Sequence, residues 1–317
     1  MWPRRFSLAI IVLAWGVCLA QTPKTAEEYN NRGLERQAKG DLAGAIEDYT
    51  AAITRTGRPE HLTGIYFNRG NARFAKEDWD GAIADYTKSI EYDRKNPDGY
   101  YMRAVAYLNK SDYDHAIVDF SKAIELEPRS SMAYNNRGTA RSAKNDIEGA
   151  IADYTKAVEV NPKYAEAFYN RGAALQQKKD FEGAIKDYTS ALALAPKFAE
   201  AYANRGQAKQ SKEDFDGAIA DYDSALRLKA DEGTFFARAT ARESKKDMDG
   251  ALTDYNKVLE LNPNSAEAYA SRAVIETLKG NTSSAAQDFS KAFAIDPNLR
   301  ARYKQFVDRH PTVKPKP

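Results

Sequence analysis

The 317-residue sequence contains a single cysteine, Cys18, and only three histidines. One thiol cannot build a disulfide framework, and so few cysteines and histidines disfavour a multi-ligand metal cluster. A charge excess of one sign is also lacking, because 47 lysines and arginines face 45 aspartates and glutamates. This balance gives no case for a nucleic-acid partner. The composition therefore predicts neither a cofactor nor a nucleic-acid function.

The first twenty residues form a short apolar segment that follows two arginines. Arg4 and Arg5 precede 15 uncharged, mostly apolar residues, and polar residues begin at Gln21. A charged start, a short apolar stretch and a small residue before the cut are typical of a secretory signal peptide. We predict a signal peptide at residues 1–20, cleaved after Ala20. The protein is then expected to be exported, periplasmic if the source is bacterial and otherwise secreted.

The apolar run is shorter than a membrane-spanning helix. A spanning helix needs about 20 apolar residues, whereas this run has 15. The mature chain is therefore expected to have no integral membrane span, and an uncleaved signal anchor is the alternative. Cleavage would also remove Cys18, and a chain without cysteine suits an oxidising compartment.

From residue 26 onward, one pattern of about 34 residues recurs eight times. An arginine marks each copy, and successive arginines are 37, 34, 34, 34, 34, 33 and 34 residues apart. A fixed period of this length indicates a repeat architecture. The aligned arginines, which we number position 7 of each copy, are Arg32, Arg69, Arg103, Arg137, Arg171, Arg205, Arg238 and Arg272.

Small and aromatic residues also recur at fixed positions. Position 8 is Gly or Ala, and position 20 is always Ala. Position 24 is aromatic in every copy: Tyr49, Tyr86, Phe120, Tyr154, Tyr188, Tyr222, Tyr255 and Phe289. Together with the 34-residue period, these positions resemble the tetratricopeptide repeat. The resemblance covers about residues 26–299 and implies eight helix-turn-helix units.

Within each copy, apolar residues follow helical spacing on both sides of a short break. In the fifth copy, Phe168, Gly172 and Leu175 lie at i, i+4 and i+7, and the spacing resumes at Phe181. This pattern predicts two amphipathic helices joined by a tight turn. One hairpin cannot bury both its faces, so neighbouring hairpins must stack. The predicted fold is all-α, a right-handed α-solenoid, or superhelix, of tetratricopeptide repeats.

The expected organisation follows from these boundaries. A short N-terminal segment at 21–25 precedes the repeats at 26–299, and a capping helix at 300–310 and a disordered Pro/Lys tail at 311–317 follow them. The capping helix is expected because Leu299, Tyr303 and Phe306 lie at i, i+4 and i+7. The repeats are expected to start near residues 26, 63, 97, 131, 165, 199, 232 and 266.

Two charged positions are the same in all eight copies. Position 7 is arginine, and position 23, sixteen residues later, is aspartate. Eight identical pairs indicate architecture rather than catalysis, because a half-buried arginine needs a partner and its planar fork fits a carboxylate. We expect structural ion pairs with Asp48, Asp85, Asp119, Asp153, Asp187, Asp221, Asp254 and Asp288.

Position 6 is asparagine in five copies: Asn31, Asn68, Asn136, Asn170 and Asn204. In the tetratricopeptide family this position faces the concave groove, and a line of asparagines there resembles a ladder that holds bound peptides. The chemistry agrees, since an asparagine amide offers both a donor and an acceptor to a peptide backbone. The alternative is that these amides bond within the array or face water.

Position 5 is aromatic in four copies: Phe67, Tyr101, Tyr169 and Phe236. If this position borders the groove, the four rings are candidate partner-binding residues that select side chains. Packing between adjacent first helices is the alternative.

No enzyme is indicated by the sequence. His61, His115 and His310 lie at unrelated positions, and there is no nucleophile elbow or phosphate loop. We predict an exported protein–protein interaction scaffold that binds an extended peptide or protein segment in its concave groove, as a monomer or with weak self-association. Two alternatives stay open. One is a structural organiser of an envelope, secretion or pilus assembly through convex-face contacts, and the other is a carbohydrate-binding solenoid.

Overall fold

The computed structural model describes residues 23–313 of the chain. The predicted signal peptide at 1–20 lies outside these residues. The chain divides into two compact units, one up to Gly99 and one from Tyr100 onward. The first unit contains α1 (Ala26–Ala38), α2 (Leu42–Arg55), α3 (Pro59–Ala75) and α4 (Trp79–Tyr92), and α5 (Pro97–Asn109) begins at its end.

The second unit continues the same alternation of helices. It contains α6 (Tyr113–Leu126), α7 (Ser131–Ala143), α8 (Ile147–Val160), α9 (Ala165–Gln177), α10 (Phe181–Leu194), α11 (Ala199–Ser211), α12 (Phe215–Leu228), α13 (Glu232–Ser244), α14 (Met248–Leu261), α15 (Ala266–Leu278), α16 (Thr282–Ile295), α17 (Asn298–Arg302), α18 (Lys304–Arg309) and the 3-10 helix η1 (Pro311–Val313). Between residues 23 and 313 there is no strand. Over the same stretch, no helix combines the length and apolarity that a bilayer crossing requires.

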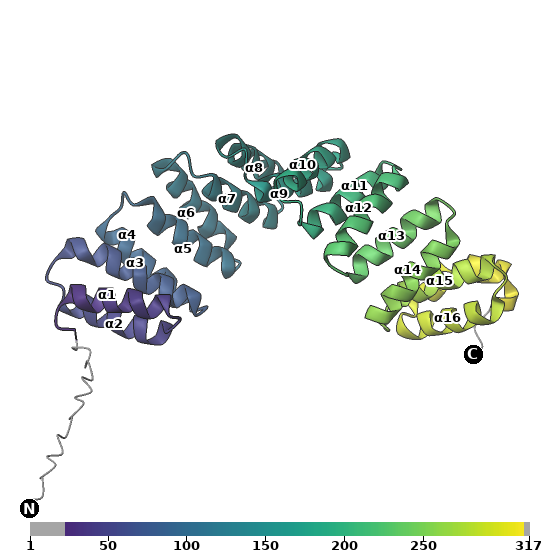
Figure 1. Ribbon diagram of the computed structural model, residues 1–317, viewed down its shortest axis with the longest axis horizontal. Coiled ribbons are helices and arrows are strands. Elements are labelled where there is room, and N and C mark those ends of the chain that lie inside the picture. Colours follow the sequence, from purple (N-terminus) through teal and green to yellow (C-terminus); the bar gives the residue numbers. More distant parts are fainter. Residues whose placement is uncertain (1–22, 314–317) are drawn as a thin grey trace, which may run out of the picture. The chain divides into compact units, whose positions relative to one another are not determined.

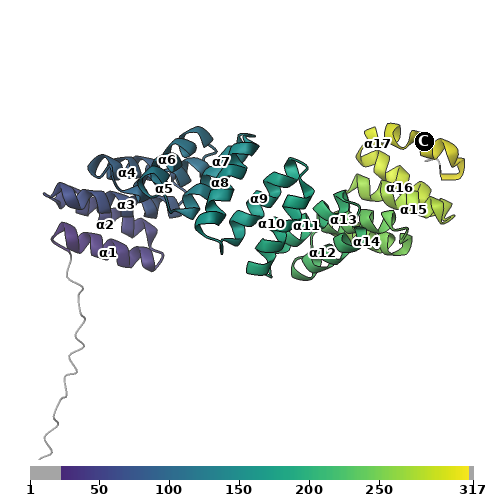
Figure 2. The same ribbon diagram turned by 90° about the horizontal axis from the view of Figure 1, so that it is seen from above.

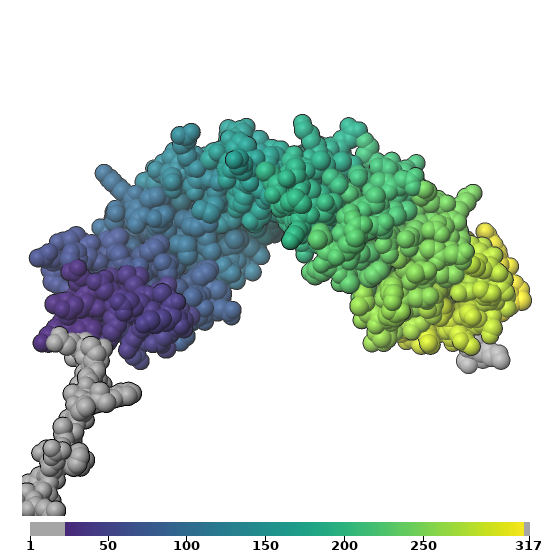
Figure 3. Space-filling model, viewed as in Figure 1, coloured from purple at the N-terminus to yellow at the C-terminus, as the bar shows by residue number. Residues whose placement is uncertain are grey.

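Consecutive helices pair into hairpins, and consecutive hairpins stack. In the second unit, α7 packs on α8, α8 on α9, and this order continues through α15 and α16. The first helices of neighbouring hairpins also touch, as α7 does with α9 and α9 with α11. The ribbon views show this succession (Figures 1 and 2), and the space-filling view shows the second unit packed continuously from blue-teal to yellow (Figure 3). The predicted all-α solenoid is confirmed.

The turn inside each hairpin is short because its backbone enters the left-handed region. Glycine takes this conformation in the first and last repeats, as at Gly40 (φ 82°), but six other residues adopt it too, including Lys179 (φ 64°). An aspartate then caps the second helix in most repeats. The Asp180 carboxylate, for example, accepts the Gly183 N–H at 3.0 Å. Such a cap satisfies a backbone donor that the helix start leaves open.

Small residues at position 8 allow the two helices of a hairpin to approach closely. A Cβ added to Gly33 would lie 2.6 Å from the ring of Tyr49. The position 24 rings are buried, and this burial raises the pKa of Tyr49 to about 12. The buried Tyr188 hydroxyl donates to Gln176 Oε1 at 3.0 Å, so its polar end is satisfied.

The expected ion pairs form in every repeat, within the repeat. In the fifth repeat, Arg171 donates from Nε and Nη2 to the two carboxylate oxygens of Asp187, at 2.7 and 2.8 Å. The same two-bond fork joins position 7 to position 23 in the other seven repeats. The carboxylates are nearly inaccessible, with at most 5% of the residue exposed. The prediction of structural ion pairs is confirmed.

The arginine also reaches out of its own repeat. Arg171 Nη1 donates to Thr155 Oγ1 of the preceding repeat at 3.2 Å, and the guanidinium lies 5.6 Å from the centre of the Phe168 ring. Arg205 donates to Thr189 in the same way at 3.0 Å. One side chain thus closes a hairpin and fastens it to the previous one.

A second cation at position 11 supports the aspartate in five repeats, and the sequence analysis missed it. Arg141 Nη1, for example, lies 2.9 Å from Asp153 Oδ2. The fifth repeat carries Leu175 at this position, so the second cation is lacking there. The five cations are Arg36, Arg73, Arg141, Lys209 and Arg242.

The lysines at position 14 contribute contacts between repeats. Seven of them occupy the C-cap of the first helix, where a cation is favourable. In the second unit they also pair with an acidic residue of the preceding repeat. These pairs are Lys144 with Asp114, Lys178 with Glu148, Lys212 with Glu182, Lys245 with Asp216 and Lys279 with Asp249.

The C-terminal end differs from the expectation. The single capping helix at 300–310 is wrong, because the helix breaks at Tyr303 into α17 and α18. Disorder from residue 311 is wrong for residues 311–313, which form η1. Val313 is fully buried there, in the same cluster as Leu299 and Phe293. The chain folds back because burying Leu299, Val307 and Val313 together outweighs continuing one straight helix. Residues 314–317 lie outside the described part.

One helix start also differs. The second repeat was expected to begin near residue 63, but α3 starts at Pro59 and is 17 residues long. The 37-residue step between Arg32 and Arg69 supplies the extra residues, and proline is favoured at the first position of a helix.

The fifth repeat lacks a position 11 cation and the fourth repeat has one, so the loss of the position 7 arginine should destabilise the two repeats to different extents. Arg171→Ala leaves the buried Asp187 without a cation, and we expect it to lower the free energy of unfolding by about 3 kcal/mol. Arg137→Ala is the matched control, because Arg141 still neutralises Asp153, and we expect a smaller loss. Urea unfolding followed by far-UV circular dichroism measures both. Equal losses would contradict the role given to position 11.

Candidate peptide-binding surface

The five position 6 asparagines lie on the first helices of their repeats. In the first unit Asn31 is exposed on α1 and Asn68 is half-buried on α3. In the second unit the remaining three, Asn136, Asn170 and Asn204, are half-buried on α7, α9 and α11. These three come from consecutive repeats, so they follow one another along the stacked first helices.

Four of the five amides are tied to the preceding repeat. Each Nδ2 donates to the position 5 side chain of that repeat, and never to its own. The bonds join Asn68 to Asn30 Oδ1 (3.1 Å), Asn136 to Tyr101 Oη (3.0 Å), Asn170 to Asn135 Oδ1 (2.9 Å) and Asn204 to Tyr169 Oη (3.0 Å).

These bonds change what the asparagines can offer a partner. One N–H of each bridging amide is used inside the array, which fixes the direction of the amide group. The carbonyl oxygen is the remaining acceptor of each amide, and Asn136 Oδ1 already accepts from Asn135 Nδ2 at 3.3 Å. The alternative considered from the sequence, bonding within the array, describes the donor half of these amides and also the acceptor of Asn136. Contact with a peptide stays a prediction.

The four position 5 aromatic rings pack against the position 24 ring on the second helix of their own repeat. The Phe67 ring lies 5.7 Å from that of Tyr86, and the Tyr169 ring lies 5.8 Å from that of Tyr188. Tyr101 with Phe120 and Phe236 with Tyr255 form matching pairs at 5.7 and 5.4 Å. All four are half-buried, and the Tyr169 ring also contacts that of Phe198, with ring centres 4.6 Å apart.

Burial and hydrogen bonding set the electrostatics of the two tyrosines. Burial raises the pKa of Tyr101 and of Tyr169, while the hydrogen bonds from Asn136 and Asn204 act in the opposite direction. Both hydroxyls are therefore neutral at physiological pH. A carboxylate at position 2 of the sixth repeat also lies near this surface. Glu200 Oε1 is 3.4 Å from Lys229 Nζ.

Two cavities open beside position 6 asparagines. In the first unit a cavity of about 420 Å³ includes Asn31 and Asn68 together with Glu27, Glu60 and His61. In the second unit a cavity of about 230 Å³ includes Asn204 and Tyr169. The sequence predicted these asparagines as site residues, but it did not predict the cavities.

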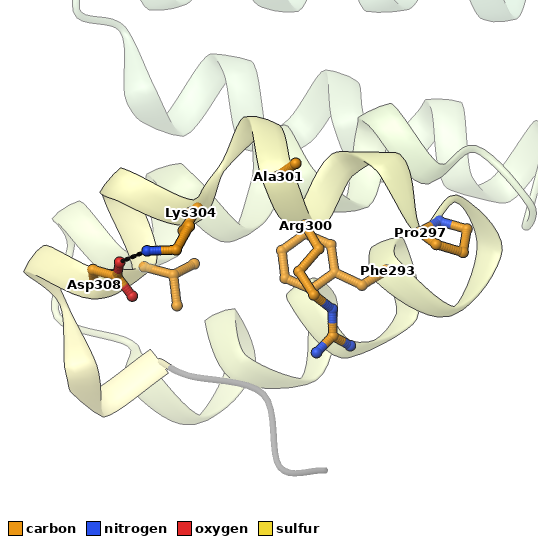
Figure 4. Close-up of a pocket in the computed structure, with 7 residues that line it drawn as sticks. Phe293, Pro297, Arg300, Ala301, Lys304 and Asp308 are labelled. Carbon is orange, nitrogen blue, oxygen red and sulfur yellow. Dashed lines mark hydrogen bonds and ion pairs between the residues drawn. The ribbon is translucent and has the colours of Figure 1, made fainter.

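A third cavity lies in the C-terminal cap, away from every residue that the sequence singled out. Its volume is about 480 Å³, and the Phe293 ring, Arg300, Lys304 and Asp308 line it, with Lys304 and Asp308 paired at 2.7 Å (Figure 4). The sequence signal was indirect: the tail from residue 300 is rich in basic residues. Across residues 23–313, no group of three or more His, Cys, Asp or Glu side chains could hold a metal ion.

The stacked hairpins define an α-solenoid, and family comparison identifies which kind. Models for the TPR or tetratricopeptide repeat match residues 70–111 and 139–179, 97–130 and 165–198, 236–299, and 199–232. Together these matches cover more than half of the chain. The chain is therefore a tetratricopeptide-repeat protein, as the period and the small and aromatic positions predicted.

Several solved structures share the fold. The C-terminal part of a TPR repeat-containing protein from Cytophaga hutchinsonii is 21% identical, with a TM-score of 0.62 over 73% of this chain and 95% of that chain. A MamA protein is 26% identical, with a TM-score of 0.50 over 59% and 96%. YrrB, described as a TPR protein with an unusual peptide-binding site, is 20% identical, with a TM-score of 0.52 over 58% and 95%. The comparison with curated proteins gives no match.

The bridge between Asn204 and Tyr169 can be tested on its own. Asn204→Ala removes one hydrogen bond between repeats, and we expect it to lower the free energy of unfolding by about 1 kcal/mol. Tyr169→Phe removes the acceptor and should cost a similar amount. The double variant should lose less than the sum, since both changes break the same bond. Strictly additive losses in urea unfolding would show that the bridge contributes nothing.

Proposed function

We propose that this protein is an exported scaffold that binds an extended segment of a partner protein along its first helices. The observation that carries the proposal is the run of bridged asparagines on α7, α9 and α11. Their spacing, one per repeat, offers a regular series of acceptors to a chain laid across the repeats. Half-burial favours such contacts, because a hydrogen bond is stronger where water is partly excluded.

The bridges also suggest a mechanism of recognition. Each amide is already oriented by the preceding repeat, so binding need not freeze its rotation. The carbonyl oxygens would accept backbone N–H groups, which every partner sequence except proline provides. Affinity would thus be largely independent of sequence, and the accessible sides of Tyr101, Tyr169 and Phe236 would add selectivity.

The comparisons support the proposal in a limited way. Tetratricopeptide-repeat proteins are generally scaffolds without catalytic activity, and YrrB is described as having a peptide-binding site. At 20% identity YrrB supports the shared architecture, so the binding residues proposed here rest on this chain's own hydrogen bonds.

The binding surface is tested by removing three amides together. We expect Asn136→Ala/Asn170→Ala/Asn204→Ala to abolish capture of protein partners from an extract of the compartment to which the chain is exported. The triple change also removes bridges between repeats, so a control must separate stability from contact. Tyr101→Phe/Tyr169→Phe removes two of the same bridges but keeps every amide, and it should retain capture.

Capture by the triple variant at the wild-type level, measured by affinity purification and mass spectrometry, would refute this surface. It would favour contacts through the second helices, as in a structural organiser. Loss of capture by both variants would show that binding requires the bridges themselves, through array stability or through the amide orientation that they set.

Export is a separate part of the proposal, and it rests on the apolar run that ends at Ala20. We expect the protein isolated after expression of the full chain in its native host to begin at Gln21. Amino-terminal sequencing of protein from the cytoplasmic and exported fractions checks this expectation. A chain that keeps Met1 and stays in the cytoplasmic fraction would refute export, and one that keeps Met1 in the membrane fraction would indicate a signal anchor.

A further inference from the structure

The cavity beside Asn204 lies where the sixth repeat carries smaller side chains than the fifth. It lies among α9, α11, the end of α12 and the start of α13. Six of the residues that line its volume of about 230 Å³ are Tyr169, Ala203, Asn204, Lys229, Asp231 and Thr234.

The fifth repeat shows one way in which the equivalent space is filled. There Tyr169 at position 5 packs against Phe198, the last residue of the repeat, with ring centres 4.6 Å apart. The corresponding residues of the sixth repeat are Ala203 and Asp231. Two aromatic rings are thus replaced by a methyl group and a short carboxylate. The space that remains is that of an aromatic side chain which this chain does not supply.

We propose that the cavity accepts one aromatic side chain of the bound partner segment. This inference rests on the proposed function and names the partner chemistry that the sixth repeat selects. Its volume lies below the roughly 300 Å³ at which pockets for whole small molecules begin, so a single side chain is the fitting occupant.

Several polar atoms of the cavity already have partners within the protein. Asp231 Oδ2 accepts the backbone N–H and the hydroxyl of Thr234 at 2.8 and 2.7 Å. The Asn204 amide is held by Tyr169. Ala203 and Ala225 provide the apolar lining.

Lysine favours an aromatic guest over an aliphatic one. The Lys229 ammonium lies 3.4 Å from a carboxylate oxygen of Glu200, yet two-thirds of the lysine side chain is exposed, and it also lines the cavity. A cation next to a ring is attracted by the π-electrons, a gain that a leucine or valine side chain cannot provide. Asn204 also lines the cavity, and its carbonyl oxygen would accept the N–H of the residue that bears the ring.

The test fills the cavity with the residue that the neighbouring repeat already carries. Ala203→Tyr copies Tyr169, so the array has a precedent for this side chain at this position. Ala294→Tyr, on the exposed surface of α16, is the matched control. Both variants are checked for wild-type melting before use. A phage-displayed library of random 12-residue peptides is then selected on the purified wild-type protein.

We expect the selected peptides to share a Phe, Tyr or Trp at one aligned place. Replacing that residue by alanine should weaken binding about tenfold, as for an anchor side chain. Ala203→Tyr should weaken binding by a similar factor, and the two changes together should weaken it no further. Ala294→Tyr should bind as the wild type does.

Two sets of results would overturn the inference in different ways. If the peptides bind Ala203→Tyr as tightly as the wild type, or if leucine replaces the aromatic residue without loss, the cavity does not select a ring. The proposed function still stands in that case, provided the triple asparagine variant loses the peptides. If no peptide is selected, or if the triple variant binds undiminished, the proposed function fails and this inference fails with it.

Discussion

The fork between arginine at position 7 and aspartate at position 23 is the interaction on which the array depends. It joins the two helices of a hairpin by two charge-assisted hydrogen bonds, and these are among the stronger contacts available to a protein. The carboxylate is buried, so its desolvation must be offset by its partners. The third nitrogen of the same guanidinium reaches the preceding repeat, as Arg171 does to Thr155. One side chain therefore both closes its own hairpin and attaches it to the preceding one.

The fork also separates the supporting residues from the candidate binding residues. Position 7 points toward its aspartate, while the neighbouring position 6 donates across to the preceding first helix. Polar contacts between repeats therefore include two parallel systems besides the position 14 lysines. In one, guanidinium groups donate to polar side chains on the preceding second helices, and in the other, amides donate to position 5 on the preceding first helices. The second system is half-buried, and it alone borders the two cavities that contain asparagines.

Much of this fold could be predicted from periodicity, because the same residue pattern occurs in each of the eight repeats. The sixteen-residue separation of Arg171 and Asp187 was enough to predict their pairing. The second cation was overlooked because position 11 is cationic in only five repeats and is Tyr107, Leu175 or Glu276 in the others, so its recurrence is weaker. The broken cap was unpredictable for another reason. Helical spacing continues through Tyr303, and only the burial of Val313 in three dimensions makes the chain turn back.

The site was predicted less completely than the fold. The sequence identified Asn204 and Tyr169 but not the bond between them, because that bond joins residues 35 apart on different hairpins. The amide direction depends on which side chain the previous repeat supplies at position 5. The cavity depends on two small replacements, at Ala203 and Asp231, that are unremarkable singly and leave a gap only when they face each other.

The variation at position 11 affects how such an array can change over time. Repeat arrays behave approximately as chains of units coupled to their neighbours, so a local substitution is felt mainly by one hairpin and the two beside it. The residue at position 11 either pairs with the buried aspartate, as Arg141 does, or does not, as with Leu175. It therefore changes the stability of one hairpin and leaves the position 6 asparagines unchanged. The stability of one hairpin can therefore change without any change at position 6, one repeat at a time.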